Sequence, residues 1–198
     1  MIGESLMSGF VGAVIGGVIT GGFTLYGIWR SEKFARSSSS ANEAELVTAL
    51  LQAIHDELEV VFDRYRAQAA PLVEALGDNE PFLVYFPIAS DYFTVFNGNA
   101  HLIGRVRDHD LRRSIVRTYV VSKGLVDSFR MNNHMLMEYE RAHELAAATQ
   151  LPADLATRTA KLEGLVKYGS ALKKDHYEAT RERDELFRRF HKRGVLKE

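Results

Sequence analysis

The sequence contains no cysteine, which removes disulfides, thiolate metal sites and a cysteine nucleophile from consideration. Proline is scarce: its four positions are 71, 81, 87 and 152, so long stretches contain no residue that would break a helix. The formal net charge is −1, which gives no overall electrostatic signal for nucleic acid. A chain of 198 residues is long enough for one ordinary domain with a small additional segment.

Charge is also absent from one long stretch near the N-terminus. No charged residue lies between Glu4 and Arg30, so residues 5–29 form an uncharged run of 25 residues. As a helix this run would span about 37 Å, more than the roughly 30 Å of a bilayer core. Tyr26 and Trp29 stand at its C-terminal end, where interfacial aromatic residues occur. The run therefore predicts a transmembrane helix, and the positive-inside rule places everything after Arg30 in the cytoplasm.

Two other interpretations of this stretch are disfavoured. A cleaved signal peptide needs a positively charged start, and "MIGES" contains no lysine or arginine. A dinucleotide-binding loop needs G-x-G-x-x-G between a strand and a helix. In "GAVIGG" Val14 replaces the middle glycine, and no βαβ pattern follows.

Small residues in the predicted membrane helix recur at every fourth position, in two adjacent rows. The rows are Gly9, Ala13, Gly17, Gly21 and Gly12, Gly16, Thr20, Thr24. Such repeats let membrane helices approach closely. We therefore expect this helix to self-associate, with a monomeric glycine-rich anchor as the alternative.

The rest of the chain predicts an all-α fold. The expected organisation is a tail at 1–4, the membrane helix at 5–29, a joint at 30–42 and a cytoplasmic helical domain at 43–198. The domain is expected to be an antiparallel bundle of three long helices with a short aromatic-rich segment. If successive long helices alternate in direction, the basic cluster "RRFHKR" (188–193) lies at the end of the bundle away from the membrane.

Local signals set the expected bounds of the three helices. The first follows an apolar seam close to a heptad, at Val47, Leu51, Ile54, Leu58, Val61, Tyr65, Ala69, Leu72 and Leu76, with a kink expected at Pro71. Asp108 is the expected N-cap of the second helix, which runs to about residue 150. Pro152 begins the third helix, and Gly194 is its expected C-cap.

Aromatic residues gather between the first two long helices. They are Phe82, Tyr85, Phe86, Tyr92, Phe93 and Phe96. We expect an extended stretch packed across the bundle, followed by a short helix over 91–104 with Ser90 as its cap. The segment is interpreted as a hydrophobic plug of the core, and the alternative is an aromatic pocket for a ligand or a partner segment.

Asn132 and Asn133 fall at or near the apolar seam of the second long helix. A buried asparagine can fix the register or the oligomeric state of packed helices. That is the preferred interpretation, and a polar binding spot inside the bundle is the alternative.

Catalytic and metal-binding motifs are missing. The pair His134 and Glu138 could share a helix face, but a zinc site of the H-E-x-x-H kind needs a second histidine there. No Walker loop, nucleophile elbow or R-x₄₋₆-H signature occurs. We therefore predict a non-enzymatic protein without a metal or cofactor, and a divergent hydrolase or nuclease is the least favoured alternative.

Taken together, these features resemble, in architecture only, small bacterial single-pass inner-membrane proteins with a cytoplasmic helical domain. The leading hypothesis is a membrane-anchored homo-oligomer whose bundle binds or senses an unknown cytoplasmic protein. The bilayer is its other expected partner, and nucleic acid is not expected. The alternative is a pore-forming effector of the phage-defence or toxin type, in which glycine-faced helices assemble in the inner membrane.

Overall fold

The computed structural model describes residues 42–88 and 92–195, which contain helices and no strand. The predicted all-α class is thus confirmed for this part of the chain. The chain divides into two compact units, Met1–Leu46 and Val47–Glu198, and the architecture below is that of the second.

The predicted membrane helix lies outside the described residues, and so do residues 30–41 of the joint. The proposed association and interface residues lie there too: Gly9, Gly12, Ala13, Gly16, Gly17, Thr20, Gly21, Tyr26, Trp29 and Arg30. Within the described ranges, no helix is both long and apolar enough to cross a membrane.

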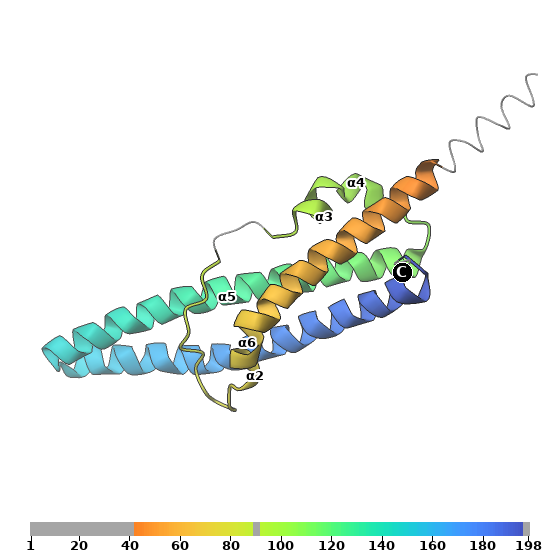
Figure 1. Ribbon diagram of the computed structural model, residues 1–198. Helices are drawn as coiled ribbons and strands as arrows, with labels where there is room; N and C mark the ends of the chain where they lie inside the picture. Colours follow the sequence, from red (N-terminus) through yellow and green to blue (C-terminus); the bar gives the residue numbers. More distant parts are fainter. Residues whose placement is uncertain (1–41, 89–91, 196–198) are drawn as a thin grey trace, which may run out of the picture. The chain divides into compact units, whose positions relative to one another are not determined.

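The described residues form three long helices and three short ones (Figure 1). In chain order they are a helix over 42–68, α2 (Ala70–Glu74), α3 (Thr94–Gly98), α4 (Ala100–Ile103), α5 (His109–Thr149) and α6 (Pro152–Lys192). An extended segment lies between α2 and α3. The predicted bounds of α5 and α6 agree with these to within a few residues. In place of one short helix over 91–104, the chain forms α3 and α4. The expected cap, Ser90, lies outside the described residues.

The ends of α5 and α6 form as their sequences predict. Asp108 caps α5, and its carboxylate accepts a hydrogen bond from the Leu111 amide at 2.9 Å. Gln150 adopts a left-handed conformation (φ 54°) that ends α5, and Pro152 starts α6. Gly194 follows α6 with φ 60°, a conformation that glycine adopts without strain.

The first long helix breaks at Ala69, just before Pro71. Proline has no amide hydrogen to donate, and it also restricts the residue before it. The break changes the phase of the apolar seam by one residue. Val73 is therefore buried, whereas the predicted seam residue Leu72 is 45% exposed.

The predicted alternation of helix directions is wrong. Gln52 donates to the Val195 carbonyl at 3.1 Å, and Tyr65 contacts His176, so the first helix is antiparallel to α6. Its Glu57 side chain contacts Tyr119, and Tyr65 packs on Phe129, so it is parallel to α5. The aromatic segment causes this, because it carries the chain back along the bundle before α5 begins. The basic cluster at 188–193 consequently lies at the same end as residue 52, not at the opposite end.

Candidate functional site

The aromatic segment crosses α5, and its six aromatic side chains lie in three kinds of environment. Phe82 and Phe93 are buried in the core. Phe86, Tyr92 and Phe96 are partly buried against it, and Tyr85 is 57% exposed. From Phe82 to Ile88 the chain has no regular secondary structure.

Two neighbouring asparagines of α5 hold the backbone of the extended stretch. Asn133 donates from its amide nitrogen to the Phe86 carbonyl (2.6 Å), and its amide oxygen accepts from the Phe86 amide (3.1 Å). Asn132, fully buried, donates to the Phe82 carbonyl at 3.0 Å. A side-chain amide thereby replaces the strand partner that this stretch lacks, since a buried backbone group needs a hydrogen bond. The asparagines therefore anchor the aromatic segment to α5, a role the seam position did not indicate.

The start of α3 is held in a similar way by a carboxylate from the first helix. Glu57 accepts from the amides of Val95 (2.6 Å) and Phe96 (3.2 Å). The same carboxylate accepts from the Tyr119 hydroxyl at 2.8 Å. Burial, reinforced by this carboxylate, raises the pKa of Tyr119 well above its ordinary value. Glu57 thus fixes α3 to the bundle, and nothing in its sequence spacing signalled this.

An open cavity of about 50 Å³ lies between the first helix, the aromatic segment and α5. Its walls are apolar and aromatic, and they include Val61, Phe62, Phe86, Ile88, Tyr92, Phe93, Leu125, Val126 and Phe129. Three of the six aromatic residues singled out from the sequence therefore line it. The volume exceeds what one water molecule needs, about 10–15 Å³, and is well below the roughly 150 Å³ of a cavity that holds benzene.

One polar group in the cavity wall has no partner in the described structure. Ser122 of α5 is 3% exposed, and its hydroxyl makes no hydrogen bond to any described residue. A helical serine commonly donates to the carbonyl four residues earlier, and Ser122 does not. Leaving a buried hydroxyl unpaired costs about 1–3 kcal/mol. The cavity therefore offers an unused hydrogen-bonding group among apolar walls.

A chain of hydrogen bonds runs from Tyr65, beside the cavity, across to α6. The Tyr65 hydroxyl lies 2.7 Å from Nδ1 of His176, and Nε2 of that histidine lies 3.3 Å from the Glu74 carboxylate. Burial lowers the pKa of His176, so the ring is neutral at pH 7. In that state Nε2–H donates to Glu74 and Nδ1 accepts from Tyr65.

The Tyr65–His176–Glu74 hydrogen bonds follow the order of a nucleophile, a base and an orienting carboxylate. The pKa of Tyr65, however, does not fit an activated nucleophile. Burial, with a smaller contribution from the Glu74 charge, raises the pKa of Tyr65 above its ordinary value. The hydroxyl is thus held protonated, whereas an activated nucleophile has a lowered pKa. We assign the three side chains to positioning the first helix against α6.

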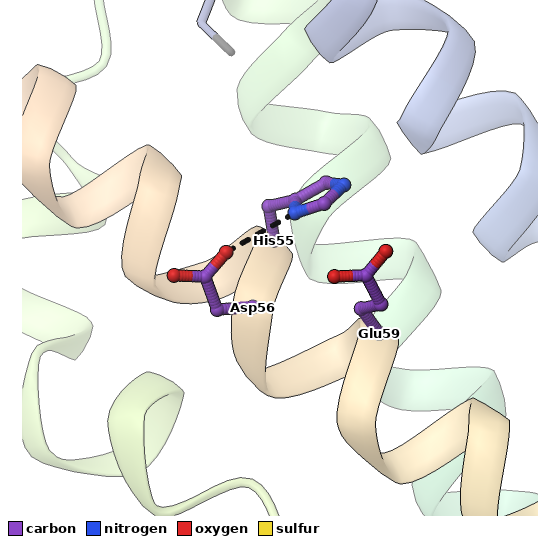
Figure 2. A group of neighbouring side chains, drawn as sticks. All are labelled: His55, Asp56 and Glu59. Atoms are coloured by element: carbon purple, nitrogen blue, oxygen red, sulfur yellow. Dashed lines mark hydrogen bonds and ion pairs between the residues drawn. The ribbon is translucent and has the colours of Figure 1, made fainter. Parts of the chain in front are cut away.

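A third group of side chains, on one turn of the first helix, has the composition of a cation site (Figure 2). His55, Asp56 and Glu59 can each bring one ligand atom to within 4.8 Å of the others. The buried His55 ring is already engaged, because it packs on Phe187 with centroids 4.4 Å apart and its Nδ1 lies 3.3 Å from Asp56. These contacts account for the geometry without an ion. The spacing i, i+1, i+4 would have identified the group in the sequence.

The His134–Glu138 pair considered from the sequence lies on the surface of α5. Nε2 of His134 lies 3.4 Å from Glu138, and Lys161 lies 2.7 Å from the same carboxylate. The Lys161 ammonium lowers the pKa of Glu138.

No protein-family model, curated protein or solved structure matches the chain.

Proposed function

We propose that the protein is a membrane-anchored, self-associating module whose helical bundle binds a cytoplasmic protein partner through the cavity at Ser122. The observation that carries this proposal is a buried hydroxyl in an apolar cavity, without a hydrogen-bond partner among the described residues. Such a hydroxyl costs stability in the free protein and is satisfied when a ligand supplies a hydrogen-bonding group.

The size of the cavity indicates what enters it. About 50 Å³ accommodates the end of a branched apolar side chain together with one polar group, and is too small for a drug-sized molecule. Arg64 lines the mouth and makes no ion pair or hydrogen bond with other described residues. A partner segment with an apolar side chain beside a carboxylate fits these features.

The cavity is tested with a small probe on the full chain in detergent micelles. Methanol carries one methyl group and one hydroxyl, and is titrated while the methyl resonances of Leu125 and Val126 are followed. Saturable shifts are expected in the wild type and absent in Ser122→Val, whose added methyl groups occupy the cavity. Ser170→Val, an equal change at an exposed position of α6, should leave the titration unchanged.

Stability gives a second readout at the same position. Ser122→Ala removes an unpaired hydroxyl from a buried site, so it is expected to stabilise the bundle by about 1 kcal/mol. Chemical denaturation measures this. Destabilisation would mean that the hydroxyl has a partner in the folded protein, and the proposal would then fail.

The anchor and its self-association rest on the uncharged run at 5–29 and its two small-residue rows. The mass of the full chain in nanodiscs tests them against a variant with leucine at Gly12, Gly16, Gly17 and Gly21. A discrete oligomer that dissociates in the variant supports association, and a monomer in both overturns it. The same rows favour the alternative of a pore-forming effector, which ion flux through proteoliposomes would reveal.

A further inference from the structure

One end of the bundle carries two basic stretches, beside a stretch of the first helix (47–63) that contains four carboxylates and no lysine or arginine. This end consists of the start of α5 and the end of α6, and the bond from Gln52 to Val195 places the start of the first helix there as well. Residues 105–113 contain four arginines and two aspartates. Residues 185–195 contain three arginines, one lysine and one glutamate. We call these two stretches the basic end.

Two of the three carboxylates of the basic end form ion pairs within the bundle: Asp108 with Arg193, and Glu185 with Arg188 and Arg189. The third, Asp110, is exposed and lies 3.6 Å from the neighbouring His109 ring. Three cations, in contrast, have no ion pair or hydrogen bond to another described residue: Arg107, Arg113 and Lys192. The surplus positive charge is therefore available to an external anion.

A groove of about 640 Å³ lies on the outer side of this end, between α4 and the first turns of α5. Arg113 and Arg117 line it together with two exposed valines, Val116 and Val120. Arg117 is ion-paired with Glu178 and Glu182 of α6, whereas Arg113 has no such partner among the described residues. Val120 is 64% exposed, which is unusual for an apolar side chain on a helix that is otherwise packed on one face. Cationic and apolar groups thus alternate along one surface.

We propose that the basic end and its groove bind the headgroups of anionic phospholipids. Arginines attract the phosphates, and valines beside them match the boundary between headgroups and acyl chains. A phosphate on nucleic acid would use the arginines alone and leave the valines without a role.

The position of the basic end in the chain also favours lipid. Twelve residues separate Trp29, the end of the predicted membrane helix, from residue 42, where the first helix starts. A chain of that length reaches at most about 42 Å when extended and about 18 Å as a helix. The first helix therefore starts within reach of the bilayer surface, and it starts at the basic end. The expected antiparallel order would have put residues 188–193 at the far end.

The experiment uses the absence of native cysteine, because an introduced thiol is then the only labelling site. The full chain with Val120→Cys carries an environment-sensitive dye and is reconstituted into nanodiscs that contain lipid-borne quenchers. One set contains phosphatidylcholine alone, and the other also contains phosphatidylglycerol. Leu145→Cys, at the far end of α5, carries the same dye as the control position.

Quenching at residue 120 is expected only with phosphatidylglycerol, and raised salt should reduce it. Arg113→Glu combined with Lys192→Glu should weaken the effect by about fivefold or more, on the scale known for single basic residues at anionic surfaces. The matched control is Arg158→Glu, a charge reversal near the α5–α6 loop, which should leave the quenching unchanged. Circular dichroism verifies that all variants fold.

Each other outcome overturns the proposal. Equal quenching in both lipid compositions would mean that charge does not select the lipid. Quenching at both 120 and 145 would mean that the bundle lies along the bilayer and does not bind by this end. No quenching at 120 would mean that the groove does not contact the lipid. Carbonate extraction separately reports whether the chain is anchored, so failure of the anchor is distinguishable from failure of the groove.

Discussion

The two halves of the α5–α6 hairpin are both helical and have different surroundings. The half near the basic end is covered by the first long helix and the aromatic segment, and the half near residue 150 extends beyond them (Figure 1). On α6 every buried residue lies at or after Leu165. Past Leu136, the only buried residues of α5 are Ala142 and Ala146.

The covered half therefore has a three-layered apolar core, whereas the tip has only a narrow contact between two helices. The tip also differs in charge, because residues 137–164 contain five acidic and three basic residues. Its helices are built from strong helix formers, as in "AHELAAAT", so local propensity maintains them where burial does not. Helical structure and tertiary stability thus have separate origins along the same two helices.

The largest expected difference between the halves concerns leucine truncation. Leu172→Ala removes a fully buried side chain from the covered half and should destabilise the protein by about 2–5 kcal/mol. Leu155→Ala makes the same change at the tip, where the side chain is only partly buried, and should cost less than about 1 kcal/mol. Chemical denaturation of both variants measures this. Equal losses would show that the tip belongs to the same cooperative core.

A pair of glycines tests where the covering segment touches the hairpin. A Cβ at Gly169 would lie 2.5 Å from the Glu80 carbonyl oxygen, so Gly169→Ala should destabilise by about 1–3 kcal/mol. A Cβ at Gly124, on the exposed side of α5, would meet no atom within 4 Å. Gly124→Ala should therefore stabilise α5 by about 0.5–1 kcal/mol. The two substitutions are identical, so opposite signs would isolate the contact with residue 80. Thermal unfolding distinguishes them.

The buried histidine of the covered half makes stability depend on pH. Burial lowers the pKa of His176 in the folded state, so the unfolded chain binds more protons between the two pKa values. The contribution is present above the unfolded value of about 6.5 and is lost as pH falls from there toward the folded pKa. The slope from this one group cannot exceed about 1.4 kcal/mol per pH unit.

The variant His176→Gln retains a side-chain acceptor for Tyr65 and cannot titrate. Urea unfolding between pH 8 and pH 5, compared with the wild type, should show a shallower loss of stability for the variant. Parallel curves would assign the pH dependence to other groups.

The smallest expected effect is at the loop of the tip. Gln150 has φ 54°, in the left-handed region that glycine occupies without strain, so Gln150→Gly should stabilise by a few tenths to about 1 kcal/mol. Because the tip is only narrowly packed, the gain should appear chiefly as slower amide exchange near residues 146–155. Unchanged exchange there would contradict this account.

The helices were predictable because their signals are local. Asp108, Pro152 and Gly194 act on the backbone within one turn, and the structure places all three at the expected ends. The sequence did not predict that Val73 is buried in place of Leu72, because this depends on the rotation at which the helix resumes after Ala69. Pro71 reveals that the helix breaks, but not by what angle.

The sequence identified some residues of the candidate site but none of the contacts between them. The aromatic cluster and the two asparagines were singled out, yet their connection was not, since a side-chain amide that binds backbone 47 residues away has no sequence pattern. Glu57, Ser122 and the Tyr65–His176–Glu74 chain were missed for the same reason. Each owes its role to a partner on another element.

The sequence by itself determined that this chain is helical, where its long helices end, and that an uncharged run of 25 residues precedes them. These properties follow from short-range chemistry: helix propensity, capping, proline geometry and hydrophobic length. Only the tertiary structure decided that the first helix is parallel to α5. The extended segment between them can run back along the bundle or stay at one end, and the two arrangements differ little in local free energy. That choice placed the basic residues of 188–193 beside those of 105–113, and it created the cavity at Ser122.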